Sequence, residues 1–399
     1  MSAAECEEFR PNGNVPNLRF PEFEGEWEET RLKEISKFSK ERLNSIELSC
    51  SNYVTTENML QDYKGIVSAT NLPTNTNVVK FSKGDVLLSN IRPYLKKVWY
   101  ADKNGGCSAD VFVFKALPIC DSNFLHHVIA NDRFIKFVMG GAKGVKMPRG
   151  DKEQMITYKV GLPCIEEQKK IANLLSLLDE RISTQNKIIE DLKKLRSAIS
   201  KHLFERRDLL GTKIKLSKVA ELKNGYAFQS SKYNSLGEWK IITITNVTGE
   251  RYIKENDCNC ILEIPNDIQK HQKLKANDVL ISLTGNVGRV SLCTEGLFLL
   301  NQRVGLLQLK VSEDREYIYQ ALSSHKFENS MIACAQGAAQ MNIGKGDVEN
   351  YILPYSFNRK NINVVASVLR AYDKYIINET NLQSILHIQK QYLLRQMFI

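Results

Sequence analysis

Two short polar stretches combine residue types that suit contact with nucleic acid. Residues 90–97 (Asn-Ile-Arg-Pro-Tyr-Leu-Lys-Lys) follow an apolar run and interleave basic groups with an amide and an aromatic ring, and residues 283–289 carry similar groups. Basic groups neutralise phosphates, and amide groups reach base edges. The alternative for each residue is a solvated surface side chain. The candidate DNA-binding residues here are Lys83, Asn90, Arg92, Tyr94, Lys96 and Lys97, together with Thr284, Asn286 and Arg289.

Two glycine- and alanine-rich loops supply the other candidates. Residues 140–151 carry Lys143, Lys146 and Arg149, whereas residues 335–347 carry Gln336, Gln340, Asn342 and Lys345. Arginine and lysine match O6 and N7 of guanine, and glutamine and asparagine match N6 and N7 of adenine. The alternative is a polar turn that faces water. The two loops differ in chemistry although the sequences that flank them match. This difference is expected if two copies of one domain recognise different base sequences.

Motifs for catalysis, metal binding or cofactor binding are incomplete throughout the sequence. Gly344-Lys345 resembles a phosphate-binding loop, but Ala339 and Gly346 replace its required glycine and hydroxyl residue. Leu353-Pro354-Tyr355 faintly resembles the signature of amino-methyltransferases, but the preceding Asn or Asp is missing. The six histidines show no metal-ligand spacing. We therefore expect no catalytic residue, metal or cofactor in this chain. The alternatives are a DNA methyltransferase or nuclease with an unrecognised active site, or a coiled-coil scaffold without DNA binding.

The candidate stretches belong to an internal repeat. Gly84–Ser89 (GDVLLS) recurs as Asn277–Ser282 (NDVLIS), an offset of 193 residues, and each copy predicts a turn followed by a buried strand. The same or nearly the same offset relates three further pairs: residues 111–114 and 304–307, residues 160–163 and 351–354, and residues 171–179 and 365–373. Matches at so constant an offset establish a duplication.

Each half of the duplication ends in a long helical pattern. Residues 166 to about 205 contain no Gly or Pro, and at about 1.5 Å per residue they predict a rod of about 58 Å. Apolar residues spaced four and three apart predict that the two helices pack together, although Gln185, Arg196 and Glu379 interrupt the stripe. The predicted packing residues are Ile171, Leu175, Leu178, Ile182, Ile189, Leu192 and Ile199 in the first helix, and Val365, Leu369, Tyr372, Ile376, Leu386 and Leu393 in the second.

The order of these parts predicts an α+β monomer with pseudo-twofold symmetry. Two strand-rich recognition domains are joined by two long antiparallel, coiled-coil-like helices, so that the chain imitates a symmetric DNA-binding dimer. The predicted boundaries are an N-terminal tail at 1–16, the first domain at 17–163, the first helix at 164–206, a hinge at 207–212, the second domain at 213–357 and the second helix at 358–399.

Composition is that of a folded protein with a basic surface. A total of 55 Lys and Arg against 45 Asp and Glu gives a net charge of +10, which favours a polyanionic partner only weakly. Nine scattered cysteines without a CxxC pair indicate reduced thiols and hence a cytoplasmic protein. No apolar run suits a signal peptide or a membrane span, so we expect no membrane partner.

The arrangement resembles the specificity subunits of type I restriction–modification systems. The resemblance is carried by the opening Val15–Phe23 (VPNLRFPEF) followed by Trp27, by the transition from Leu162-Pro163 to Glu166–Ala172 (EEQKKIA), and by Leu177-Leu178-Asp179. It covers nearly the whole chain. The second transition, residues 353–360, lacks the Glu-Gln pair.

The resemblance implies a role in specificity and assembly without catalysis. Each domain would read one half of a split sequence in double-stranded DNA, and the helices would set the gap. The chain would bind two modification subunits, which hold S-adenosylmethionine and methylate adenine. Two restriction subunits, which use ATP and Mg²⁺, would complete a site-specific nuclease.

Overall fold

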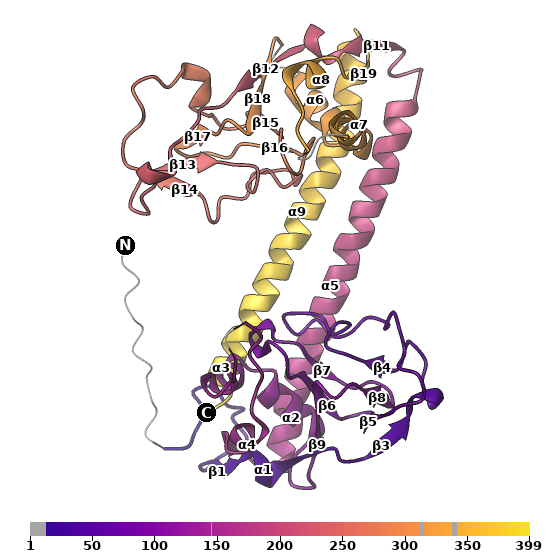
Figure 1. Cartoon of the computed structure of the whole chain (residues 1–399), viewed down its shortest axis with the longest axis vertical. Helices are drawn as coiled ribbons and strands as arrows, with labels where there is room; N and C mark the ends of the chain where they lie inside the picture. Colours follow the sequence, from indigo (N-terminus) through magenta and orange to yellow (C-terminus); the bar gives the residue numbers. More distant parts are fainter. Residues whose placement is uncertain (1–12, 145, 312–313, 337–340) are drawn as a thin grey trace. The chain divides into compact units, whose positions relative to one another are not determined.

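The computed structural model describes residues 13–144, 146–311, 314–336 and 341–399. It forms two compact units, one made of Met1–Thr184 with Gln383–Ile399 and the other of Gln185–Leu382 (Figure 1). Each unit therefore contains one strand-rich domain and a segment of each long helix. Among the described residues, no helix is both long enough and apolar enough to span a membrane.

In unit 1 the domain is built on two four-stranded sheets, ordered β2-β9-β6-β7 and β3-β5-β8-β4, with a separate β1-β10 pair. Strand β6 (Val86–Ser89) is fully buried because it lies between β9 and β7 and is covered by α2. The other elements are β1 (Glu28–Arg31), α1 (Leu32–Ile35), β2 (Ser36–Phe38), β3 (Arg42–Asn44), β4 (Tyr53–Val54), β5 (Asn77–Phe81), the short 3-10 helix η2 (Pro93–Leu95), β7 (Val98–Tyr100), β8 (Gly105–Cys107), β9 (Val111–Ala116), α2 (Ser122–Ile129), α3 (Asp132–Gly140), α4 (Lys152–Met155) and β10 (Lys159–Leu162).

Unit 2 repeats the main sheet of unit 1, and its second sheet has three strands, ordered β14-β13-β17. Its main sheet is ordered β12-β18-β15-β16, and β15 pairs with β18 as Val279↔Leu307, which is the register of Val86↔Phe114 moved on by 193 residues. The elements are β11 (Thr212–Lys215), β12 (Ala220–Asn224), β13 (Trp239–Ile242), β14 (Asn259–Ile261), β15 (Val279–Ser282), β16 (Val290–Leu292), β17 (Phe298–Leu300), β18 (Val304–Leu309), α6 (Arg315–Leu322), α7 (His325–Ala335), α8 (Lys345–Glu349) and β19 (Ile352–Tyr355), with the 3-10 helix η5 (Lys270–Gln272) between β14 and β15. The duplication inferred from sequence is therefore a duplication of fold.

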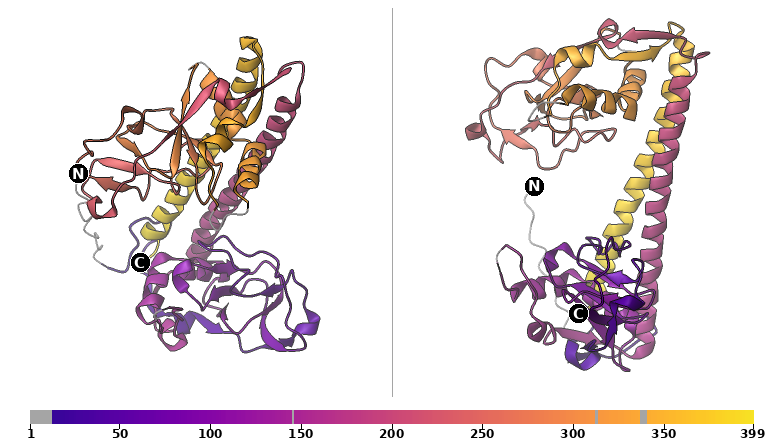
Figure 2. Two further views of the ribbon diagram at one scale, coloured as in Figure 1. Left: turned by 45° about the horizontal axis from the view of Figure 1, so that its top comes forward. Right: turned by 45° about the vertical axis from the view of Figure 1, so that its right-hand side comes forward.

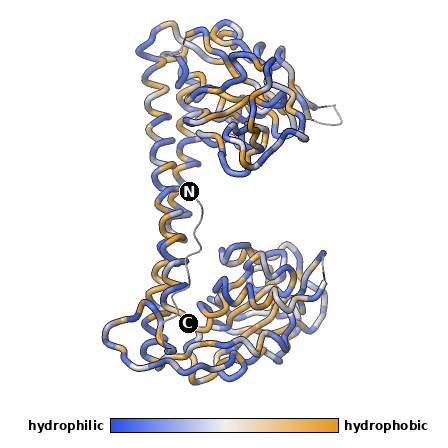
Figure 3. The backbone as a smooth tube through the Cα atoms, turned by 90° about the vertical axis from the view of Figure 1, so that its left-hand side faces the viewer, coloured by the Kyte–Doolittle hydropathy of each residue, from blue (hydrophilic) through white to orange (hydrophobic). Residues whose placement is uncertain are grey.

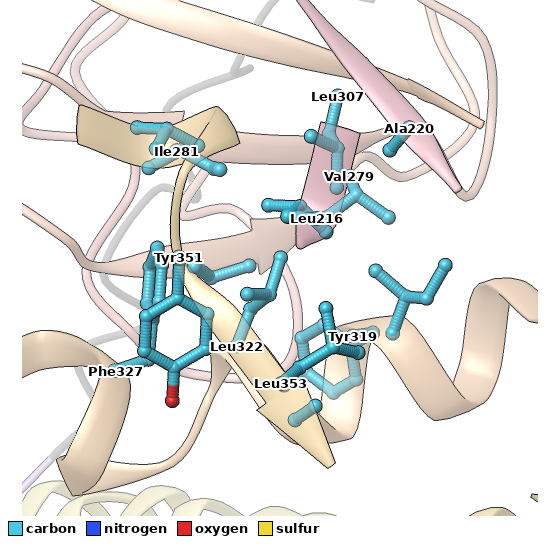
Figure 4. Packing of buried hydrophobic residues seen from close by; sticks show 14 of the residues in the cluster. Leu216, Ala220, Val279, Ile281, Leu307, Tyr319, Leu322, Phe327, Tyr351 and Leu353 are labelled. Carbon is cyan, nitrogen blue, oxygen red and sulfur yellow. The ribbon is translucent and has the colours of Figure 1, made fainter. Parts of the chain in front are cut away.

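The core of unit 2 lies between its main sheet and helices α6 and α7. Ile281 and Leu307 of the sheet belong to one buried cluster with Leu322 of α6, Phe327 of α7 and Leu353 of β19 (Figure 4). Residues from both long helices, among them Leu203, Val365 and Leu369, join the same cluster. The domain therefore packs directly against both helices and shares its hydrophobic core with them.

The two long helices are α5 (Ile165–Glu205) and α9 (Arg359–Gln396), and apolar residues recur along both (Figure 3). Within each unit their segments lie side by side (Figure 1, Figure 2). In unit 2, Gln185 bonds to Glu379 and Arg196 bonds to Asp373. The later residue of α5 therefore contacts the earlier residue of α9. The helices are antiparallel, as predicted. None of the predicted packing residues is exposed: Ile171, Leu175, Ile182, Ile189, Val365, Leu369 and Leu386 are buried, and Leu178, Leu192, Ile199, Tyr372, Ile376 and Leu393 are half-buried.

The polar interruptions of the helical stripe bond to polar groups on the facing helix. Gln185 donates to the backbone carbonyl of Glu379 (3.1 Å) and to its carboxylate, and Arg196 Nε lies 3.1 Å from Asp373. An equivalent ion pair joins Lys390 to Asp179 in unit 1, at positions 194 residues from Arg196 and Asp373. Because unpaired polar groups in a seam are costly, these pairs favour one register over its neighbours.

Asp373 is also the centre of a buried polar network that fastens the second domain to its helices. Its carboxylate accepts from Arg196 of α5 (3.1 Å), from Arg251 (2.9 Å) and from Gln320 of α6 (2.6 Å). Arg251 completes a second ion pair with Glu316 (2.6 Å). The Asp373 and Arg251 side chains are only 8% and 9% exposed, so each charge depends on its partners.

Asp373→Ala should therefore destabilise unit 2 by about 3–5 kcal/mol, because two guanidinium groups lose a buried partner. The equivalent Asp179→Ala should cost unit 1 less, because Asp179 is 35% exposed and forms one ion pair, with Lys390, whose long side chain can move its ammonium group into water. Amide hydrogen exchange of the full chain, resolved by peptide, measures the free energy of opening in each unit. Equal and small losses for both variants would contradict this account of the network.

Candidate nucleic-acid interface

The two candidate stretches of unit 1 form one surface at the end of β6. A β-bridge joins Ile91 to Arg149, and the Arg92 amide donates to the carbonyl of Pro148 (2.8 Å). The Gly150 amide reaches the carbonyl of Asn90 (3.3 Å). Arg92 adopts a left-handed conformation (φ 52°) that turns the chain out of the strand before Pro93. The loops at 90–97 and 143–150 are therefore held together by backbone bonds.

Unit 2 contains the same arrangement. Thr284 bridges Asn342, the Gly285 amide donates to the carbonyl of Met341 (3.0 Å), and the Ile343 amide donates to that of Leu283 (2.9 Å). Thr284 and Asn342 each lie 193 residues after Ile91 and Arg149, so the two bridges are equivalent. The left-handed turn falls here on Gly285 (φ +72°).

Arg149 and Asn342 occupy equivalent places with different chemistry. The Arg149 side chain is 56% exposed and its guanidinium lies 3.3 Å from Asp110. Asn342 is exposed, and its Oδ1 accepts from Thr284 Oγ1 (3.2 Å), which orients the amide. An exposed guanidinium suits guanine and an oriented amide suits adenine. Equivalent places on the same backbone frame therefore carry a guanidinium in unit 1 and an amide in unit 2.

Several of the basic candidates are paired with acids. Lys96 lies 2.8 Å from Asp132, and its equivalent Arg289 lies 3.5 Å from Glu328, so each half repeats this bridge to a following helix. Lys143 lies 2.7 Å from Asp151, and this bond raises the pKa of Lys143 and lowers that of Asp151. Exposed pairs of this kind are weak, so phosphates can replace the acids at little cost.

Three candidate lysines differ from the others in their contacts or their place in the fold. Lys97 Nζ donates to the carbonyl of Thr56 (2.6 Å), and Lys345 Nζ lies 2.9 Å from Glu221 of β12. Lys83 precedes β6 whereas Asn90 follows it, so Lys83 lies at the opposite end of the strand from the bridged loops. Lys97 and Lys345 therefore each bond to a partner within the protein, and Lys83 lies apart from the bridged loops.

Most of the remaining candidates lie on the surface, whereas Asn90 is half-buried. Within the described ranges, Arg92 and Lys146 are exposed cations without an ion pair, and the Tyr94 side chain lies on the surface. Asn90 is half-buried, and its Oδ1 is buried without a hydrogen-bond partner. Asn286 and Gln336 are exposed, the latter at the end of α7. Gln340 lies outside the described residues.

Sequence reasoning missed Arg303. Its carbonyl accepts from the Leu283 amide (3.0 Å), as that of Asp110 accepts from Asn90 (2.8 Å), so Arg303 and Asp110 are equivalent neighbours of the bridged loops. Unit 1 places an acid beside Arg149, whereas unit 2 places an exposed cation near Asn342. Applying the 193-residue offset to every position near the loops would have found it.

Metal-assisted chemistry has no visible support in the part of the chain that the structure describes. No group of three or more His, Cys, Asp or Glu side chains there is arranged to hold a metal ion. The buried His126 and His127 have pKa values lowered by desolvation, which keeps both rings neutral.

Comparison with known proteins agrees with this arrangement. Residues 24–194 and 212–387 each match the model of the type I restriction modification DNA specificity domain. The type I restriction enzyme MjaVIII specificity subunit of Methanocaldococcus jannaschii is 26% identical over 369 residues, covering 84% of this chain and 83% of that protein. A putative MjaX specificity subunit of the same organism is 29% identical over 216 residues, covering 50% of this chain and 49% of that protein.

Solved structures share the fold. The type I restriction-modification S subunit from M. genitalium superposes with a TM-score of 0.63 at 16% identity, covering 96% of this chain and 99% of that one. A chain from a structural study of the assembly of a type I restriction-modification system gives 0.54 at 18% identity, covering 92% and 96%. With two matching domains over most of its length, the chain belongs to the type I restriction–modification DNA specificity family and is a non-catalytic specificity subunit.

Proposed function

We propose that this chain reads a bipartite sequence in double-stranded DNA, with one half-site for each bridged pair of loops. The observation that carries the proposal is the equivalence of the Ile91–Arg149 and Thr284–Asn342 bridges, which present unlike side chains on matching frames. Arg92, Lys146, Arg289 and Arg303 would neutralise phosphates around the reading residues. Each domain would then read its half-site independently.

Exchanging residues 17–160 for the first domain of a relative should change one half-site and leave the other intact. The physical reason is that every backbone bond holding the Ile91–Arg149 bridge lies within unit 1. Methylated bases mapped in cells that express the exchanged chain with its modification subunits provide the measurement. A change in both half-sites would contradict independent reading.

The helices would also bind the modification subunits. Each unit carries large apolar side chains that remain on the surface of its helical segments, and exposed apolar groups of this kind favour protein partners. They are Leu177, Ile385, Ile388 and Tyr392 in unit 1, and Ile188, Leu195, Val364, Val368 and Tyr375 in unit 2. Two similar surfaces suit two modification subunits, which would hold S-adenosylmethionine. Two restriction subunits, holding ATP and Mg²⁺, would complete a complex that acts in the cytoplasm.

Ile388→Glu should weaken binding of the modification subunit by about 30-fold or more, because a carboxylate would replace a side chain that is 67% exposed and available to a partner. Leu236→Glu is the matched control, since Leu236 is 82% exposed and lies away from both helices. Co-purification and a titration of the two proteins give the affinities. Equal effects of the two substitutions would show that the helical surface is not the docking site.

A further inference from the structure

Strands β12, β18 and β15 of unit 2 can be located in Figure 1. Residues of these three strands line a basic hollow of about 510 Å³. It lies where β15 begins at Val279, whereas the reading loop at 283–289 follows the other end of that strand. The hollow is therefore separate from the bridged loops. Its apolar lining comes from Val279, Leu306, Leu307 and Leu309, and its cations are Lys223, Lys270, Lys273, Lys275 and Arg315.

The cations of this hollow greatly outnumber its acids. Among the described residues that line the hollow, Asp278 is the only one with a carboxylate, and its Oδ2 accepts a hydrogen bond from the backbone amide of Lys275 (2.8 Å). Lys223 is neutralised by Glu221 at 2.8 Å. Within the described ranges, the other four cations form no ion pair. Four like charges gathered around one concave surface repel each other, and a bound anion would relieve that repulsion.

The repeat shows that the fold does not need these charges. The 193-residue offset and the strand registers place Ser39, Asn77, Lys80, Ser82 and Ser122 where unit 2 has Lys223, Lys270, Lys273, Lys275 and Arg315. Of the five positions that are cationic in unit 2, only one is cationic in unit 1. That residue is Lys80, and its Nζ lies 3.6 Å from the carboxylate of Glu41. Since both halves build the same sheet, the cluster is a property of unit 2 and not of the scaffold.

We propose that this hollow binds the polyphosphate group of a small molecule, with adjacent phosphates held by Lys270, Lys273, Lys275 and Arg315. The four cations come from three segments, namely η5, the turn before β15 and the start of α6, and a chain of phosphates can reach more of them than one phosphate can. The volume is that of a small-molecule site. A duplex is a convex rod, which matches the exposed reading loops better than a hollow at the opposite end of β15.

The test uses the full chain and a variant that copies unit 1, namely Lys270→Asn, Lys275→Ser and Arg315→Ser. Unit 1 folds with these residues at the equivalent positions, so the variant should fold. The matched control, Lys213→Asn, Lys232→Ser and Lys326→Ser, removes the same charge from exposed positions outside the hollow. Calorimetric titration at physiological ionic strength uses inorganic tripolyphosphate and, separately, a nucleoside triphosphate.

We expect saturable binding of one tripolyphosphate per chain, weakened about tenfold or more in the hollow variant and unchanged in the control. Tighter binding of the nucleoside triphosphate than of tripolyphosphate would support a nucleotide as the natural ligand. No saturable binding to the unmodified chain, or equal losses in both variants, would overturn the proposal. So would a hollow variant whose only change is a weaker salt dependence of duplex binding, because the hollow would then hold DNA phosphates.

Discussion

Replacing Asn342 with alanine is expected to relax one position of the second half-site and to leave the first half-site unchanged. An oriented amide that bonds both N6 and N7 of adenine discriminates against other bases by about 1–3 kcal/mol, so specificity at that position should fall about 5- to 150-fold. Asn342 is suited to this contact because it is exposed and its Oδ1 is oriented by Thr284 Oγ1 at 3.2 Å.

The matched variant is Arg149→Ala, which should relax one position of the first half-site by a similar factor. Its effect should include a small loss at all sequences, since removal of the guanidinium also leaves Asp110 facing the DNA phosphates. Methylation by the assembled complex on duplexes that differ at single positions measures both variants. Uniform weakening without any loss of specificity would show that Asn342 and Arg149 contact the backbone and not the bases.

Lengthening both helices by one heptad should lengthen the gap between the half-sites. The insertions belong after Thr184 in α5 and after Leu382 in α9, where the chain passes from one unit to the other. Because the helices are antiparallel, inserting in both keeps the Arg196–Asp373 and Lys390–Asp179 pairs in register. Seven residues add about 10 Å of helix and each base pair about 3.4 Å of DNA, so the gap should grow by at most about three base pairs.

The bases read on either side should stay the same, since the reading loops are untouched. A control chain with seven extra residues in the exposed turn after Leu236 should keep its original gap. Methylation-site mapping of both chains, each assembled with its modification subunits, gives the gap directly. An active lengthened complex with an unchanged gap would mean that the partner subunits set the spacing.

The elements that sequence predicted best are those with a local signal. The apolar runs at 86–89 and 279–282 are fully buried strands, and the helical pattern that begins near residue 166 is α5. The repeat strengthened each prediction, because two related sequences had to suit one fold. Hydrophobic periodicity depends on near neighbours, so it can be read without knowledge of the tertiary structure.

The contacts that build the site depend on pairings distant in sequence. No local sequence pattern predicts that Arg149 forms a β-bridge with Ile91, or that Lys97 donates a hydrogen bond to the carbonyl of Thr56. Gln185, Arg196 and Glu379 were predicted only as interruptions of an apolar stripe, yet Gln185 bonds Glu379 and Arg196 bonds Asp373. Whether a polar residue between two helices stabilises their packing depends on its partner on the other helix, and that partner is known only from the tertiary structure.

The central claim is that one chain supplies two independent readers of a split DNA sequence. The most direct test is to map methylated adenines across the genome of cells that contain the modification subunits, with and without this chain. We predict that the chain adds a single methylated motif, with two specified parts separated by a fixed unspecified gap, and that Asn342→Ala alters only one part. A continuous motif, or methylation that does not depend on the chain, would contradict the account.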